Sequence, residues 1–249
     1  MTAAEIDTSI FHRISGIVSS KLSLDEMLGE VIGLTIQAAA CEACLVYLFD
    51  QEANEVVLRA SQVPHAAALG NLRMKVGEGI TGWVAEHQSV VALSSNASAD
   101  ARFQRFAGLV EDTYEAFLSV PLVSGGDLVG VINVHHRAPH IHTPYEVSTL
   151  TFIGQQLGGA VAKSVLEAEK AKLLQETIEA RRELEARKVI ERAKGILQQR
   201  TGLSEEEAYL TLRNQSRKLH RPMKELAEAL ILSEDLQRHS SFGMKPSPD

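Results

Sequence analysis

A strong helix-start signal near residue 143 precedes a long stretch without proline. Thr143 can cap a helix, Pro144 suits the first helical position, and Glu146 completes a capping box. The next proline is Pro222, so the sequence allows one continuous helix from Pro144 to about Arg200. A bend would cost least at its glycines, Gly154, Gly158 and Gly159. Such a helix would separate the chain into a part before it and a part after it.

The part before this helix has the pattern of helices followed by antiparallel strands. Apolar residues recur at helical spacing over residues 5–40, with a break around residues 19–23. Short segments rich in β-forming residues follow, and the clearest is the hairpin AFLSVPLVSGGDLVGVINVHH with its turn at residues 124–127. Helices that flank a run of antiparallel strands predict an α+β fold rather than a βαβ series.

The composition is that of an ordinary globular protein. The chain has 249 residues, of which 45% are hydrophobic and 23% charged, so wholesale disorder is not expected. No basic segment followed by an apolar core opens the sequence, and no run of about 18 apolar residues occurs, which argues against a secretory signal and against a membrane span. The two cysteines suit a reducing compartment. We therefore expect a cytoplasmic protein without a membrane partner.

An apolar stripe near heptad spacing follows the first turns of the long helix. It consists of Leu166, Leu173, Ala180 and Leu184, and it is interrupted by Lys170, Thr177 and Arg187. This pattern predicts a connecting helix over residues 166–186 that forms a short coiled-coil homodimer. The alternative is a single amphipathic helix that packs on its own domain.

The end of the chain has the signals of a three-helix, all-α module over residues 187–235. Gly202 is placed to end a helix, the segment from Ser204 to Glu207 forms a capping box, and Pro222 begins a third helix. We expect the second and third helices to make apolar contacts through Ala208, Leu210, Leu212, Leu219, Leu226, Ala229 and Leu230. The polar segment 236–249 is predicted to be a flexible tail.

This module is basic within an acidic protein. Residues 181–224 contain twelve Lys and Arg against six Glu, whereas the whole chain has a formal net charge of −7. No acidic residue occurs between Glu207 and Glu225, a segment that includes Arg213, Arg217 and Lys218. Tyr209 adds an aromatic surface, of the kind on which unpaired bases stack. A nucleic-acid partner is the first hypothesis; a solvated or protein-docking face is the alternative.

Two further motifs have structural explanations. Residues 77–82 match GxGxxG, but no buried parallel strand precedes them, so we interpret them as a tight turn into a helix rather than as a dinucleotide site. His135, His136, His140 and His142 lie within eight residues, but Pro139 forbids a helix interior there and no cysteine or carboxylate lies at ligand spacing. We therefore expect a polar, partly exposed loop and no metal site.

The cysteines give no basis for catalysis. Cys41 and Cys44 lie in an apolar segment, and in a strand their odd spacing would place them on opposite faces as small core residues. The chain has no cysteine after Cys44 and no evident nucleophile with a partnering base. We therefore predict that the protein is not an enzyme.

The basic module, ARKVIERAKGILQQRTGLSEEEAYLTLRNQSRKLHRPMKELAEAL, resembles the ANTAR domain, an RNA-binding module of bacterial antitermination regulators. The resemblance implies binding to tandem RNA hairpins with exposed loop bases, usually by a dimer. It also implies RNA contacts at the matching positions, and the charge pattern adds Lys218. The predicted RNA-binding residues are Arg187, Lys188, Arg192, Lys194, Gly195, Tyr209, Arg213, Ser216, Arg217 and Lys218.

Residues 1–165 contain segments similar to a GAF domain, a small-molecule sensor fold with an antiparallel sheet. The segments are GEGITGWVAEHQSVVALSSNASADARF and FLSVPLVSGGDLVGVINVHHRAPHIHTPYEVSTLTFIGQQLGGAV. The resemblance implies a ligand pocket between the sheet and its covering helices and loops, with no cofactor identified. Members of this family that bind cyclic nucleotides carry a signature that begins with Asn-Lys. Here Asn133 is followed by Val134 instead of a lysine, so a cyclic nucleotide is disfavoured as the ligand.

These observations predict a transcription antitermination regulator that couples a signal at the GAF domain to the binding of hairpin RNA. Three alternatives remain. A DNA-binding regulator would use the second or third helix of the module as a recognition helix. A redox enzyme would depend on Cys41 and Cys44. A dimeric scaffold would dock an acidic protein on the basic face.

Overall fold

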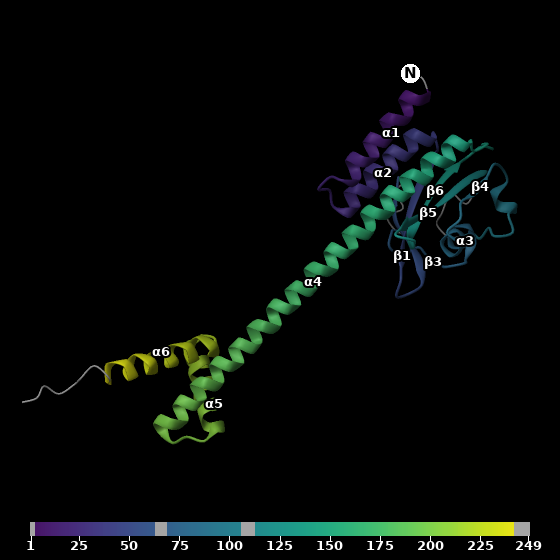
Figure 1. Ribbon diagram of the computed structural model, residues 1–249. Coiled ribbons are helices and arrows are strands. Elements are labelled where there is room, and N and C mark those ends of the chain that lie inside the picture. Colours follow the sequence, from purple (N-terminus) through teal and green to yellow (C-terminus); the bar gives the residue numbers. More distant parts are fainter. Residues whose placement is uncertain (1–2, 63–68, 106–112, 242–249) are drawn as a thin grey trace, which may run out of the picture. The chain divides into compact units, whose positions relative to one another are not determined.

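The structure is a computed structural model that describes residues 3–62, 69–105 and 113–241 (Figure 1). The chain forms two compact units, residues 1–168 and 169–249. One helix, α4 (Pro144–Thr201), is continuous over 58 residues and contributes to both units. The continuous helix predicted from the proline-free stretch is therefore confirmed. Among the described helices, none has the length and apolar content that crossing a membrane requires.

The first unit is built on a six-stranded sheet in which neighbouring strands are antiparallel, in the order β3-β2-β1-β6-β5-β4. This arrangement confirms the predicted α+β class. The strands are β1 (Ala43–Asp50), β2 (Glu55–Ser61), β3 (Arg73–Lys75), β4 (Val91–Leu93), β5 (Ala116–Ser124) and β6 (Asp127–His136). The helices are α1 (Ala3–Val18), α2 (Leu24–Ala39) and α3 (Gly79–His87), with a short 3-10 turn, η1 (Ala97–Ala99).

Helices cover both faces of this sheet (Figure 1). On one face, α1, α2 and the first part of α4 pack against side chains such as Val46 and Ile132. On the other face, α3 packs against side chains such as Leu45 and Tyr47. Adjacent residues of one strand therefore enter two different cores, because side chains alternate across a strand. This explains why the central strands have continuous apolar sequences.

The helix α4 passes through its glycines without ending, and two of them lie directly against the sheet. A Cβ atom on Gly158 would lie 2.6 Å from the backbone oxygen of Val123, and one on Gly154 would lie 3.2 Å from that of Pro121. Gly159, by contrast, has nothing within 4 Å of its Cβ position. The first two glycines therefore allow a close approach between α4 and β5.

The second unit contains the end of α4, α5 (Glu205–Leu219) and α6 (Met223–Ser241). Its core is small: Ala193, Leu212 and Ala227 are buried, with partly buried apolar side chains around them. The predicted capping box is present at the start of α5, where Ser204 N donates to Glu207 Oε2 at 2.8 Å and Glu207 N donates to Ser204 Oγ at 3.3 Å. The all-α, three-helix module is confirmed.

Some details of this module differ from the expectation. Leu210 and Leu219 are 40% and 54% exposed, and Ala229 is exposed whereas Ala227 is buried. In a core this small, only one narrow face of each helix is covered, so several of the apolar positions stay outside it. The helix α6 also includes residues 236–241 of the predicted tail, and residues 242–249 lie outside the described residues.

The middle of α4 is exposed on all sides. Every residue from 165 to 185 is exposed, and the large apolar side chains among them are Val165, Leu166, Leu173, Leu174, Ile178 and Leu184. The stripe therefore does not pack on its own domain, which was the alternative to a coiled coil.

Candidate RNA interface and sensor sites

The basic surface of α5 consists of Arg213, Arg217 and Lys218, which are all exposed. Among the described residues, no carboxylate lies within ion-pair distance, 4.0 Å, of these three side chains. Tyr209 is 40% exposed, and its spacing from Arg213 and Arg217 places all three on the same face of the helix. Two unpaired arginines on the same helix face as an aromatic ring are groups that can contact phosphates and stack on bases.

The end of α4 adds further predicted contacts, three of which are ion-paired, and two of these pairs are exposed. Lys188 Nζ lies 3.0 Å from Glu185 Oε1, and Arg192 Nη2 lies 2.9 Å from Asp235 Oδ1. Exposed pairs of this kind contribute little to stability, so these cations stay available to another anion. Arg187 is exposed. Gly195 is half-buried with nothing within 4 Å of its Cβ position, so internal packing does not require a glycine there.

Lys194 has a different environment from the other predicted contacts. Its side chain is only 8% exposed, and Nζ donates to Glu205 Oε1 at 2.7 Å and to both oxygens of Glu191 at 2.9 Å. The hydrogen bonds with Glu205 and then Glu191 raise the pKa of Lys194, and the hydrogen bond from Lys194 lowers the pKa of Glu205. The ammonium therefore joins α4 to the first turn of α5, and a direct RNA contact would have to break these pairs.

Ser216, also a predicted contact, closes the end of α5. Its Oγ donates to the carbonyl oxygen of Arg221, and Arg221 N donates to the Ser216 carbonyl at 3.1 Å. The chain turns at His220, which has a φ of +52°. Ser216 thus positions the chain between α5 and α6, a role that its sequence context did not indicate.

In the first unit, the glycine-rich motif forms the predicted tight turn into α3. Gly77 N donates to the carbonyl oxygen of Gly82 at 2.8 Å. A Cβ on Gly82 would lie 2.4 Å from the backbone oxygen of Lys75, so a larger residue would not fit. The motif therefore has a local structural explanation.

A buried polar network links α3 to the centre of the sheet. Ser119 Oγ donates to Asn133 Oδ1 at 2.6 Å, and Asn133 Nδ2 donates to Thr81 Oγ1 at 2.8 Å. All three residues are at most 4% exposed. This network could not be predicted from local sequence, because its members are up to 52 residues apart.

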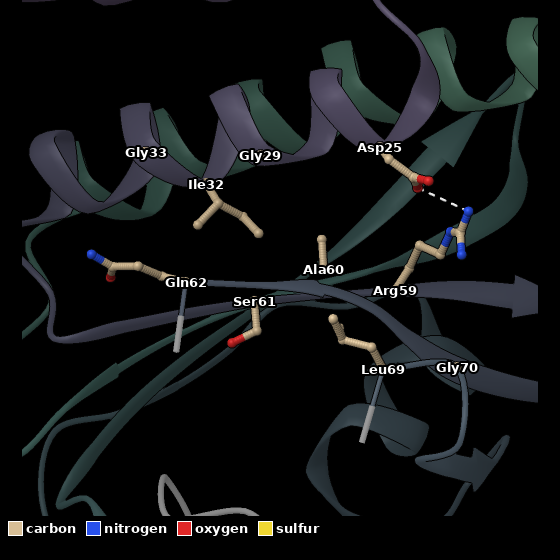
Figure 2. A pocket seen from close by; sticks show the side chains of 10 residues that line it. All are labelled: Asp25, Gly29, Ile32, Gly33, Arg59, Ala60, Ser61, Gln62, Leu69 and Gly70. Carbon is tan, nitrogen blue, oxygen red and sulfur yellow. Dashed lines mark ion pairs between the residues drawn. The ribbon is translucent and has the colours of Figure 1, made fainter. Parts of the chain in front are cut away.

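A pocket of about 450 Å³ lies between α2 and β2 (Figure 2). Its rim holds an ion pair between Asp25 and Arg59, with oxygen and nitrogen 2.8 Å apart. Within the described residues, the buried Ser61 Oγ has no hydrogen-bond partner. The lining residues are Asp25, Gly29, Ile32, Gly33, Arg59, Ala60, Ser61, Gln62, Leu69 and Gly70. Apolar side chains such as Ile32 and Leu69, together with an ion pair at the edge, can hold a small polar molecule.

The two cysteines are buried in the core between the sheet and α1, α2 and α4, as free thiols. The prediction that they are core residues is confirmed, but their placement on opposite faces is wrong. Cys41 precedes β1, so strand alternation does not relate it to Cys44. Burial raises the pKa of Cys41 to about 12 and also raises that of Cys44. Neither thiol is a ready nucleophile at neutral pH.

The histidines divide between the two faces of the sheet. His135 packs edge-on against Phe117, with ring centroids 4.4 Å apart. His136, His140 and His142 gather near the end of β6, and Glu146 lies 2.9 Å from His140. Glu146 is only six residues from His140 along the chain, and it reaches the ring because the loop after β6 returns to the start of α4.

A sheet with a pocket beneath its helices, joined through one helix to a basic helical module, defines a regulator with a sensor unit and an output unit. The chain belongs to the GAF domain family: the model of the GAF domain matches residues 23–161, and that of the ANTAR domain matches residues 179–231. The GAF domain is a sensor domain, and the ANTAR domain is the RNA-binding module of antitermination regulators.

Solved structures support the assignment of the first unit. The GAF domain of an Acinetobacter phosphoenolpyruvate-protein phosphotransferase is 25% identical, with a TM-score of 0.60 over 68% of this chain and 99% of that one. The GAF domain of the corresponding Coxiella burnetii protein is 24% identical, with a TM-score of 0.62 over the same shares.

The fold also occurs in an enzyme. The free methionine-R-sulfoxide reductase of Neisseria meningitidis is 18% identical, with a TM-score of 0.56 over 67% of this chain and 95% of that one. At this identity the likeness concerns the fold alone. No curated protein matches the chain.

Proposed function

We propose that this protein is a cytoplasmic transcription antitermination regulator that couples a signal at its GAF domain to the binding of hairpin RNA in nascent transcripts. The observation that supports this proposal most directly is the basic surface of Arg213, Arg217 and Lys218. It lies in the ANTAR domain and has no ion-pair partner among the described residues. Cations kept free of carboxylates on an otherwise acidic protein favour a polyanionic ligand.

The aromatic ring of Tyr209 favours RNA over duplex DNA in this proposal. Exposed bases in RNA loops stack on aromatic and guanidinium groups, whereas bases in a DNA duplex are already stacked. Tyr209 and Arg213 are one helical turn apart on the exposed face of α5. Together they offer a stacking surface and a phosphate contact to one loop nucleotide.

The proposal includes a homodimer that forms through α4. The exposed apolar residues between Val165 and Leu184 form a stripe that a second copy of the chain would cover. A dimer presents two basic surfaces, and two surfaces can bind tandem hairpins with higher avidity than either alone. No catalytic role is proposed, because both thiols are buried with raised pKa values.

The pocket between α2 and β2 is the proposed site of a small-molecule signal. Gly29 lines it and has nothing within 4 Å of its Cβ position, so the Cβ of a larger residue fits there, and Gly29→Leu is the variant chosen to reduce the pocket volume. A metabolite that raises the thermal midpoint of the wild-type protein should lose this effect in Gly29→Leu. An unchanged shift would place the ligand elsewhere.

RNA binding can be tested by fluorescence anisotropy with a labelled tandem-hairpin RNA and the full chain. We expect Arg213→Ala with Arg217→Ala to weaken binding by at least about tenfold, because charged hydrogen bonds are worth about 1.5–3 kcal/mol each. The slope of log affinity against log salt should fall by about 1.4–1.8 if both contact phosphates. The matched control is Arg181→Ala with Arg182→Ala, which removes the same charge from exposed positions of α4.

Two results would contradict the proposal. Equal loss of affinity in both double variants would show that only net charge matters. Unchanged binding by the α5 variant would show that the surface is not the RNA site. Competition by duplex DNA at the same concentration as hairpin RNA would favour the DNA-binding alternative instead.

A further inference from the structure

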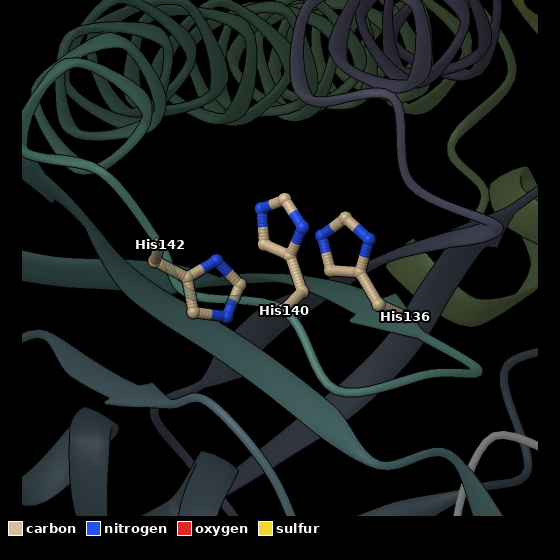
Figure 3. Close-up of side chains that lie close together, drawn as sticks. All are labelled: His136, His140 and His142. Carbon is tan, nitrogen blue, oxygen red and sulfur yellow. The ribbon is translucent and has the colours of Figure 1, made fainter.

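Three imidazole rings lie together where β6 ends and the chain turns towards α4. His136 is the last residue of β6, and His140 and His142 belong to the segment that follows. Their candidate ligand atoms all lie within 4.8 Å of one another. The rings of His136 and His140 stack with centroids 3.9 Å apart, and the ring of His142 lies 5.0 Å from that of His140 (Figure 3).

His136 is buried and His140 and His142 are partly buried, so the three rings form an enclosed cluster of imidazole nitrogens, the ligand type that zinc prefers. Among the described residues, the buried His142 Nε2 has no hydrogen-bond partner, whereas the backbone of Leu93 and of Phe117 lies within hydrogen-bonding reach of the same ring. A buried ring nitrogen without a partner is unfavourable unless a ligand satisfies it.

Glu146 holds one of the three rings by a hydrogen bond. Its Oε1 lies 2.9 Å from His140 Nε2, while its Oε2 accepts from Thr143 N at 2.7 Å and from Thr143 Oγ1 at 2.9 Å. In metal sites, a histidine ligand commonly donates its other ring N–H to a carboxylate, which fixes the ring and its tautomer. The pair of His140 and Glu146 has this arrangement.

We propose that His136, His140 and His142 bind one Zn²⁺ ion, or a similar divalent transition metal that prefers imidazole nitrogen, and that Glu146 orients His140. Zinc binds histidine nitrogen at about 2.0–2.1 Å, which places the nitrogens of a tetrahedral site about 3.3 Å apart. The ligand atoms, which lie within 4.8 Å of one another, must therefore move closer by up to about 1.5 Å, and the stacked pair must tilt. His140 is 31% exposed on its side chain, and both His140 and His142 lie in the loop after β6, so these two rings can make most of the movement towards His136.

Three histidines leave one coordination position of zinc open, unlike the closed four-ligand sites that only stabilise folds. The site also adjoins the first turn of α4, because Glu146 caps that helix. Metal binding would therefore fix the start of α4. If the proposed RNA function holds, the metal is a candidate for the input signal; the site itself does not depend on that function.

The site can be tested on the full chain after metal removal with a chelator. Titration with Zn²⁺ in a calorimeter should show one ion bound per chain, and Co²⁺ in its place should give the visible absorption of a four-coordinate ion. We expect His140→Ala with His142→Ala to lower the affinity at least a hundredfold. His12→Ala, which removes an exposed histidine of α1, is the matched control and should leave binding unchanged.

A separate measurement distinguishes loss of the site from loss of the fold. At free Zn²⁺ about a hundredfold above its Kd, the thermal midpoint of the wild type should rise by about 5–10 °C, and that of the double variant should not rise. If the double variant does not fold, the single variant His140→Gln, at a partly exposed residue, replaces it in this measurement, and its thermal midpoint should not rise with Zn²⁺. Glu146→Gln should weaken binding about 10–100-fold. Absence of a bound equivalent in the wild type, or wild-type affinity in the double variant, overturns the proposal.

Discussion

Adjacent glycines on α4 should respond in opposite ways to the same substitution. Gly158 is buried against β5, and a Cβ there would lie 2.6 Å from Val123 O and 2.8 Å from Val123 N. Gly159 is exposed, and its Cβ position is empty to 4 Å. Both lie inside the same helix, so the intrinsic helical preference of alanine over glycine, about 0.8–1.0 kcal/mol, is the same at both sites.

The close contact decides the difference between the two variants. In Gly158→Ala the obstacle is the backbone of β5 rather than a flexible side chain, so α4 and β5 must separate, at a cost of about 1–3 kcal/mol or more. After the helical gain, we expect a net loss of up to about 2 kcal/mol. Gly159→Ala meets nothing and should raise stability by about 0.5–1 kcal/mol.

The measurement is urea unfolding of the full chain followed by tryptophan fluorescence. Trp83 is the only tryptophan of the sequence and lies in α3, so the signal reports the first unit alone. We expect the midpoint to fall for Gly158→Ala and to rise for Gly159→Ala, with an unchanged slope. Equal midpoints for the two variants, or a higher one for Gly158→Ala, would refute the argument from close packing.

Three further predictions follow from other sites. Gly195→Ala should raise thermal stability by about 0.5–1 kcal/mol, because the site is helical and open; if RNA approaches the backbone there, anisotropy should show weaker binding despite the added stability. Asn133→Leu should destabilise the first unit in urea by at least about 1–3 kcal/mol, because it leaves two buried hydroxyls without their partner. The hydrogen bond from Arg102 lowers the pKa of Asp100. The ionised Asp100 therefore contributes to the free energy of unfolding at neutral pH, and this contribution is lost as the pH falls below about 3.8. Asp100→Asn should therefore flatten the acid side of the stability curve measured by urea unfolding at several pH values.

Much of the architecture could be predicted from local sequence. The capping boxes that begin α4 and α5, the glycine that ends α4 and the hairpin between β5 and β6 all depend on residues within a few positions of each other. Interactions of this range are specified by the sequence itself, because the groups meet in any chain that forms the helix or the turn. The same holds for the clustering of basic residues on α5.

The environment of individual site residues could not be predicted in this way. Lys194 was predicted to contact RNA, but in the structure its ammonium group forms an ion pair with Glu205 of α5. Ala227 is buried in place of Ala229, because the orientation of α6 depends on its packing partners. The predicted contacts at Arg213 and Arg217 remain predictions, with exposure and the absence of described ion pairs in their favour.

The sequence by itself determined the two domain families, the continuous helix α4 and the basic character of the module, since these follow from local pattern and composition. Only the tertiary structure brought His136, His140 and His142 together beside Glu146 and placed Asn133 between Thr81 and Ser119. For the network the physical reason is distance along the chain, and for the histidines it is the path of the loop after β6, which local sequence does not specify. A hydrogen bond or a ligand cluster between separate elements exists only after the sheet register and the helix packing have fixed both sides.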